Sequence, residues 1–291
     1  MLLPLAGAAI ISALPKNNEK AAKQAALGTT LVVMAVTIAM AVGFQRDNVE
    51  LQFVEKYAWI PSFGINFALG VDAIALVLIL MSVILAPIVV LAGWDEAHGG
   101  RWSVKTFYIL ILVLETMMIG VFAATDLFLF YVIFEAMLIP VYFLIGGYGT
   151  GERAAAAVKF LLYSLFGGLL MLASIIALYV MSGAQGGHTF DIDKLSQLQM
   201  SSTTQNLLFL GFFIAFAIKA PLWPFHTWLP DAAKSATPGT SVLLLGVLDK
   251  VGTFGMIRYC LTLFPEASKT FTPLIMVLAV ISIVYGAILA I

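Results

Sequence analysis

The chain has 291 residues, of which 62% are hydrophobic and only 11% are charged, and its formal net charge is −1. A soluble domain carries roughly 25% charged residues, so this composition excludes an ordinary soluble protein, and the small net charge gives no reason to expect a nucleic-acid partner. The mean hydropathy of +1.03 predicts a membrane protein. The length allows about nine membrane helices of roughly 20 residues plus loops.

Nine apolar stretches, separated by polar residues, follow one another along the chain. None alternates apolar and polar residues as the strands of a membrane barrel do, and backbone groups in lipid must bond within their own segment, so we expect helices. Each stretch after the first is long enough to cross a bilayer with some tilt. The stretches are 1–15, 26–44, 71–93, 105–124, 127–147, 159–181, 205–220, 239–264 and 272–291.

The first apolar stretch is shorter than a full membrane crossing, and the last one is interrupted by the end of the sequence. As a helix, residues 1–15 would span about 21 Å, less than the roughly 30 Å hydrocarbon core, and they lack the basic start of a signal peptide. The chain ends inside the apolar run 273–291. We therefore expect both ends to be edges of a longer polypeptide.

The helical pattern breaks after Lys219. Three prolines fall within 221–230, and a regular helix cannot continue through them. The stretch nevertheless stays aromatic and apolar, so we expect a broken helix at membrane depth, buried in protein or lining water. Pro238 and Gly239 then open the next helix.

Lysine and arginine in the loops favour one orientation. With the N-terminus outside, the inner connections carry eight basic residues and the outer ones five, which fits the positive-inside rule. The longest polar connections, about 45–70 and 182–204, then lie outside. Asp72 opens its helix, and we interpret it as a cap or an interface residue. Asp126 also starts its helix, and we interpret it as an end-of-helix acid.

Three ionisable residues lie deep inside apolar stretches: Glu135, Lys219 and Lys250. A charge in mid-bilayer costs roughly 3 kcal/mol or more, so such residues are functional by default. Counting 1.5 Å per residue places all three near the middle of the membrane. A row of titratable groups at one depth predicts a proton relay, in which a carboxylate beside Lys219 holds its proton and Lys250 receives it on release. The alternative is a structural Glu–Lys pair that sets helix register.

Three further groups are weaker candidates. Glu115 lies in the middle of 105–124 and could pair with a group elsewhere. His226 titrates near neutrality, but it could equally satisfy backbone carbonyls freed by the break. Asp249 adjoins Lys250 but points about 100° away on a helix, so it could tune Lys250 or face a different helix.

Other chemistries lack a signal in the sequence. The three histidines are scattered without ligand spacing, so we expect no metal site. No nucleotide fingerprint, P-loop or nucleophile motif occurs, and no residues are arranged to hold a flavin, a haem or an iron–sulfur cluster. We expect no cofactor in this chain.

Two stretches resemble a known family. The first is EAMLIPVYFLIG at 135–146, and the second is GFFIAFAIKAP at 211–221, which continues into HTWLPDA at 226–232. Together they resemble the membrane subunit M family of NADH-quinone oxidoreductase (respiratory complex I), the bacterial counterpart of NADH dehydrogenase subunit 4. The similarity runs along essentially the whole chain. The second stretch alone also fits multisubunit sodium/proton antiporters.

The resemblance implies an all-α polytopic fold of fourteen helices with a broken helix and two inverted repeats, of which about nine helices are present here. It divides the chain into N-terminal helices (1–104), a first five-helix repeat (105–264) and the start of a second repeat (265–291). It makes Glu135 the family's essential glutamate, Lys219 its broken-helix lysine and Lys250 its connecting lysine.

The resemblance also implies a proton-translocating subunit of a bacterial cytoplasmic-membrane enzyme. NADH, FMN, iron–sulfur clusters and quinone would be bound by partner subunits, and neighbouring antiporter-like subunits and lipid would surround the chain. Two features depart from the family. The outlet group on its later broken helix lies beyond 291, and residues 233–238 read AKSATP where the family has histidine and a Glu-Ala-Pro-Thr-like run. A sodium/proton antiporter subunit and a non-conducting scaffold are the alternatives.

Overall fold

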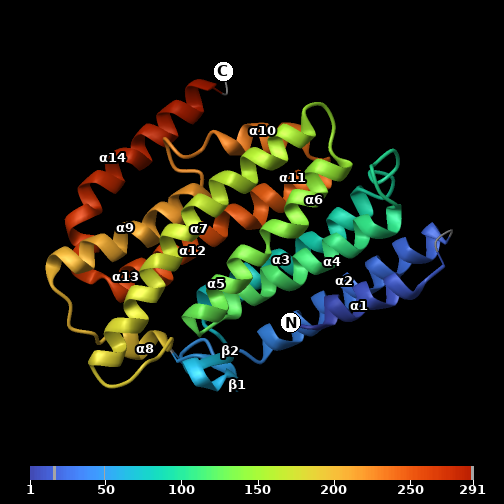
Figure 1. Cartoon of the computed structure of the whole chain (residues 1–291). Coiled ribbons are helices and arrows are strands. Elements are labelled where there is room, and N and C mark those ends of the chain that lie inside the picture. The colour runs from blue at the N-terminus through green and yellow to red at the C-terminus, as the bar shows by residue number, and fades with distance from the viewer. Residues whose placement is uncertain (16–17, 49, 290–291) are drawn as a thin grey trace.

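The structure, a computed structural model, describes residues 1–15, 18–48 and 50–289. Within these ranges, each predicted apolar stretch contains a helix, and the helices run side by side as one bundle (Figure 1). Eight helical spans in the described part are long and apolar enough to cross a membrane, and one shorter apolar helix begins the chain. The prediction of an all-helical, multi-pass membrane fold is confirmed.

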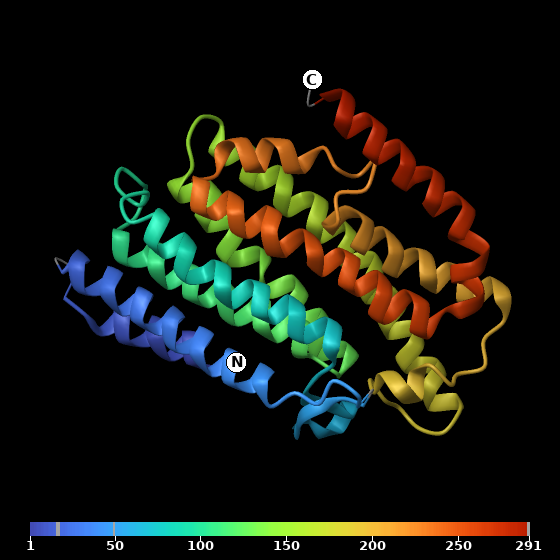
Figure 2. The same ribbon diagram turned by 180° about the vertical axis from the view of Figure 1, so that it is seen from behind.

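The first four helices pack against one another at one side of the bundle (Figure 2). Side-chain caps start three of them, because Asn18, Asp72 and Ser103 each accept a hydrogen bond from a backbone N–H of the first turn. The helices are α1 (Leu3–Ala13), α2 (Glu19–Val42), α3 (Ala73–Ala92) and α4 (Val104–Ala123).

A β-hairpin, which the sequence pattern did not predict, joins α2 to α3. Strands β1 (Gln52–Ile60) and β2 (Ile65–Val71) pair antiparallel, and Gly64 turns the chain with a φ of 67°. Its position corresponds to the predicted outer connection 45–70. Lys56 of β1 forms an ion pair with Asp191 at 3.1 Å, which ties the hairpin to the other long outer connection.

The fifth crossing consists of α5 (Leu127–Ala136) and α6 (Leu138–Tyr148), separated at Met137. Pro140 has no N–H to bond back to Ala136, which explains a helix irregularity at this place. Asp126 caps α5 by accepting from two backbone N–H groups, as predicted. Burial raises the pKa of Asp126, although its backbone N–H donors oppose that rise.

The broken helix lies among the remaining helices. They are α7 (Arg153–Ala184), the short α8 (Ile192–Leu195), α9 (Ser202–Lys219), α10 (Trp228–Ser235), α11 (Pro238–Leu243), α12 (Asp249–Gly255), α13 (Leu261–Leu263) and α14 (Pro265–Leu289). As predicted, α9 ends at Lys219 and Pro238 opens α11. Two π-helical segments, Leu244–Leu248 and Met256–Cys260, link α11, α12 and α13 into one crossing; the sequence pattern did not predict them.

Trp228, the first residue of α10, bonds back across the break to the end of α9. Its side chain is 1% exposed, and its indole Nε1 donates to the carbonyl of Ile218 at 2.8 Å. That carbonyl belongs to the last turn of α9, where regular helix bonding ends. The indole therefore satisfies a buried acceptor that the break would otherwise leave unpaired.

Replacing Trp228 with phenylalanine is expected to destabilise the fold. The Ile218 carbonyl loses its donor, which costs about 1–3 kcal/mol, and the smaller ring leaves a cavity that adds to this cost. A thermal melt of the detergent-solubilised protein measures the effect, with Trp59→Phe on the exposed face of β1 as the control. Equal melting temperatures for the two variants would show that the indole bond contributes nothing.

Candidate functional site

Glu135 lies at the end of α5, just before the interruption at Met137. Its Oε1 atom is buried and has no hydrogen-bond partner in the described part of the chain. The carboxylate packs against Gly168 of α7, where an added methyl group would lie only 1.8 Å from Oε1. Glycine is therefore required at position 168 for the carboxylate to occupy this place.

Lys219 is the last residue of α9 and is 1% exposed. Its Nζ atom makes no hydrogen bond among the described residues. The amine instead lies over two aromatic rings, 5.0 Å from the ring centroid of Phe134 and 5.7 Å from that of Phe160. A cation–π contact offsets only part of the cost of burying an ammonium group.

Glu135 and Lys219 approach each other from α5 and α9. Phe134 precedes Glu135 in sequence and lies under the Lys219 amine, and the charges of the two residues act on each other. No ion pair joins the two groups in the described ranges, since the lysine Nζ has no partner there. The geometry is that of a half-buried carboxylate and a buried amine held near each other without direct contact.

The segment 220–227 between α9 and α10 forms backbone hydrogen bonds to the end of α9. Ala220 donates its N–H to Phe216 at 2.7 Å, and Leu222 donates to Ala217 at 2.8 Å. These bonds, with that of Trp228, satisfy carbonyls at the end of α9 without His226. His226 Nδ1 is buried with no partner among the described residues, and its ring lies 5.0 Å from Tyr285 of α14.

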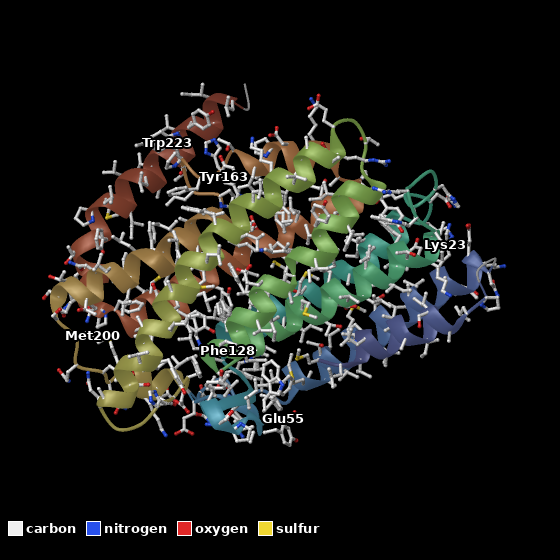
Figure 3. All side chains as sticks on the ribbon, viewed as in Figure 1. Lys23, Glu55, Phe128, Tyr163, Met200 and Trp223 are labelled. Atoms are coloured by element: carbon white, nitrogen blue, oxygen red, sulfur yellow. The ribbon has the colours of Figure 1, made fainter. Side chains whose placement is uncertain are left out.

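Two contacts attach the break to α7 (Figure 3, which labels Tyr163 on α7 and Trp223 in the break). The Tyr163 hydroxyl lies 2.8 Å from the Thr227 hydroxyl. One turn nearer the start of α7, Lys159 forms an ion pair with Asp231 at 2.7 Å. A cavity of about 420 Å³ opens beside that ion pair, where α7 begins and α10 ends.

Lys250 lies on α12 and is not brought to the other two groups. Its Nζ donates to both carboxylate oxygens of Asp249, at 3.0 and 2.8 Å, and to the carbonyl of Leu245 at 3.0 Å. Of the two alternatives for Asp249, the structure thus shows direct contact with Lys250. The lysine side chain is 44% exposed.

The face of α12 that meets α9 is a different one. A methyl group at Gly252 would lie 2.5 Å from the Ala220 backbone nitrogen, and one at Gly255 would lie 2.3 Å from the Phe216 ring. These glycines let the two helices touch at the end of α9. Lys250 is two residues before Gly252, about 200° around the helix, so it points away from this contact.

Glu115 is fully buried on α4, and neither of its carboxylate oxygens has a partner among the described residues. It lies seven residues before Phe122, hence on nearly the same helix face. The Phe122 ring packs 5.3 Å from that of Phe254 on α12. Glu115 therefore faces the α12 side of α4, apart from the Glu135–Lys219 pair.

Sequence reasoning did not identify the residues that enclose the pair. Phe134 and Phe160 lie beside the lysine amine, and Gly168 makes room for the glutamate. The aromatic residues carry no distinguishing signal in so apolar a chain. The Gly167-Gly168 pair does carry one, because glycine destabilises a helix interior by roughly 1 kcal/mol and needs a packing or functional reason.

Known proteins match this chain over its whole length. A family model described as NADH:quinone oxidoreductase/Mrp antiporter, TM, matches residues 124–291. NADH-quinone oxidoreductase subunit M of Mycobacterium tuberculosis (strain ATCC 25618 / H37Rv) is 47% identical over 323 residues, which cover 100% of this chain and 58% of that protein. Subunit M of Rhodobacter capsulatus is 39% identical over 300 residues, covering 99% and 57%.

Two solved structures superpose on this chain. A chain of respiratory complex I from Thermus thermophilus superposes with a TM-score of 0.84 at 30% identity, covering 98% of this chain and 57% of that one. A chain of the Mrp complex from Dietzia sp. superposes with a TM-score of 0.75 at 20% identity, covering 92% and 29%, which shows a shared fold only. The chain thus spans a little more than half the length of the curated relatives it matches.

Proposed function

This chain belongs to the NADH:quinone oxidoreductase/Mrp antiporter membrane family, and from that premise we propose that it translocates protons as a membrane subunit of respiratory complex I. Identity of 47% with a subunit M supports this assignment. The observation that carries the mechanism is the buried Glu135–Lys219 pair, in which two opposite charges lie near each other in an apolar site without an ion pair.

In the proposed mechanism, the negative charge of Glu135 keeps a proton on Lys219. The amine is surrounded by Phe134 and Phe160, so it has no solvent to stabilise its charge once Glu135 is neutralised or displaced. Lys219 then gives its proton to the next acceptor. Protons are proposed to reach the pair from the start of α7, where a cavity lies beside Lys159 and Asp231.

Lys250 is the proposed acceptor. Because its side chain points away from the contact between α9 and α12, the transfer must run around α12 through water or hydroxyl groups. Asp249 is bonded to the Lys250 amine at 2.8 and 3.0 Å and fixes where that amine lies. His226 and Glu115 remain weaker candidates for the route.

The energy is proposed to come from quinone reduction in partner subunits. Moving one charge against 100 mV requires about 2.3 kcal/mol, and coupling would arrive electrostatically from neighbouring antiporter-like subunits. NADH, FMN, iron–sulfur clusters and quinone would be bound by those partners. Bacterial subunit M relatives support a place in the bacterial cytoplasmic membrane. The division at 104 and 264 into N-terminal helices, first repeat and second repeat remains a prediction.

The rival function is sodium/proton exchange in a multisubunit antiporter. The structural match to an Mrp chain favours it only at the level of the fold. Sealed vesicles containing the intact complex distinguish the two. We expect NADH oxidation to drive proton uptake in sodium-free medium and a sodium gradient alone to drive none; proton movement that requires sodium would favour the antiporter.

Replacing Gly168 with alanine is expected to reduce NADH-driven proton uptake by at least about tenfold, because misplacement of a reacting group by 1 Å can cost a hundredfold. The new methyl group would occupy the space of the Glu135 carboxylate. Gly28→Ala on α2 is the matched control, since nothing lies within 4 Å of its added methyl. Equal uptake rates in the two variants would contradict the proposed position of Glu135.

A further inference from the structure

Ser164 is a buried hydroxyl that no contact within the described residues explains. The residue lies in the middle of α7 and is 3% exposed, and its Oγ has no hydrogen-bond partner there. Several serine and threonine hydroxyls inside the membrane helices bond to their own preceding turn. Ser82 donates to Leu78 at 2.7 Å, and Thr116 donates to Leu112 at 3.0 Å. Ser164 does not make this bond, so its hydroxyl remains available to another group.

On α7, Ser164 lies midway between the residue that contacts Lys219 and the residue that contacts Glu135. Phe160, four residues earlier, lies 5.7 Å from the Lys219 amine. Gly168, four residues later, contacts the Glu135 carboxylate. Residues four apart lie on one helix face, so Ser164 is the residue of that face between the lysine contact and the glutamate contact.

The register of α7 against α9 places Ser164 at the depth of Lys219. A methyl group on Gly167 would lie 2.9 Å from the Ala215 Cα, and one on Gly211 would lie 2.1 Å from the Ser174 Oγ. The two helices therefore run antiparallel with Gly167 opposite Ala215. Lys219 is four residues beyond Ala215, which brings it level with residues 163 and 164 of α7.

Three buried polar atoms on the packed helices α5, α7 and α9 thus have no partners among the described residues: Oε1 of Glu135, Nζ of Lys219 and Oγ of Ser164. A serine hydroxyl can accept a hydrogen bond from an ammonium group while it donates one to a carboxylate. Buried polar atoms are normally satisfied, by protein or by ordered water. A hydroxyl between the two charges would satisfy both of them at once.

We infer that Ser164 is the positioning residue that connects Glu135 to Lys219 through ordered water, an inference that rests on the proposed function. Through that water, the hydroxyl accepts from the ammonium and donates to the carboxylate. When a proton crosses the pair, the protonated Glu135 carboxyl gives a proton, by way of the ordered water, to the serine oxygen as the serine's own proton passes to the neutral Lys219 amine. Glu135 is then a carboxylate and Lys219 an ammonium, and the hydroxyl is unchanged.

Variants of Ser164 in the intact membrane complex, reconstituted in vesicles, test this inference. We expect Ser164→Ala to slow NADH-driven proton uptake about tenfold, the effect of losing about 1.4 kcal/mol, and to raise its solvent deuterium isotope effect, because proton transfer becomes rate-limiting. Ser164→Thr keeps the hydroxyl and should restore both quantities. Ser164→Cys keeps the volume with a weak donor and should behave like alanine. Ser174→Ala, a buried serine ten residues on in α7, is the control for packing.

The outcomes separate this inference from the proposed function. Ser164→Ala with unchanged uptake and isotope effect overturns the inference, and so do equal losses in the alanine and threonine variants, which would indicate packing alone. Glu135→Gln is measured in parallel. If it abolishes uptake while Ser164→Ala does not slow it, only the serine bridge is wrong; if Glu135→Gln pumps normally, the proposed function itself fails.

Discussion

Replacing Glu135 with glutamine is expected to leave the membrane complex assembled and to lower NADH-linked proton uptake by about a hundredfold or more, the scale of general acid–base contributions. Glutamine has nearly the shape of the glutamate, so the packing against Gly168 is kept. It carries no charge and cannot exchange a proton, so Lys219 loses the neighbouring charge that acts on it. Proton uptake by reconstituted vesicles measures the effect, and native gel electrophoresis measures assembly.

Glu55→Gln provides the matched control, because Glu55 lies on exposed strand β1 far from the pair in sequence. It should pump and assemble normally. A structural scaffold predicts the reverse pattern for Glu135→Gln, in which assembly suffers and the complexes that form still pump. Normal pumping by assembled Glu135→Gln complexes would remove this residue from any proton route.

Replacing Lys219 with arginine is expected to stop coupled turnover even though the positive charge is kept. Arginine has a pKa above 12 and does not release its proton in proteins, so the buried site would hold a permanent charge. The site is also closed, since Lys219 is 1% exposed and its amine lies between Phe134 and Phe160. The rate of NADH-driven proton uptake, compared with NADH oxidation by uncoupled complex, measures the effect.

Lys159→Arg is the control for the charge-preserving change. Lys159 is on the surface of the cavity at the start of α7, where it pairs with Asp231 at 2.7 Å, and an arginine can keep that ion pair. We expect this variant to pump at close to the normal rate. Retained turnover in Lys219→Arg would show that the residue acts through its field and does not carry the proton.

The helices could be predicted from the sequence because of the lipid environment, and the break could be predicted because of its prolines. A backbone without water must bond within its own segment, so each long apolar stretch became a helix. Three prolines between 221 and 230 end α9 at Lys219 and leave the irregular segment before α10. The structure brings Glu135 and Lys219 near each other, and their common depth in the membrane stays a prediction.

What the sequence could not provide is the direction in which a side chain points once the helix is irregular. A π-helical segment, Leu244–Leu248, immediately precedes α12, and each such segment shifts the face of every later residue. Lys250 accordingly points away from α9. The hairpin between α2 and α3 was missed because the strands have no clear alternation, and Glu55 and Lys56 lie side by side in β1.

The most direct measurement of proton exchange within the buried pair is infrared difference spectroscopy on the working complex. During NADH-driven turnover, we predict a carboxylic acid band from Glu135 that appears as the residue takes up a proton, shifts in deuterated solvent and is missing in Glu135→Gln. A spectrum in which wild type and Glu135→Gln show the same carboxyl changes would contradict the account.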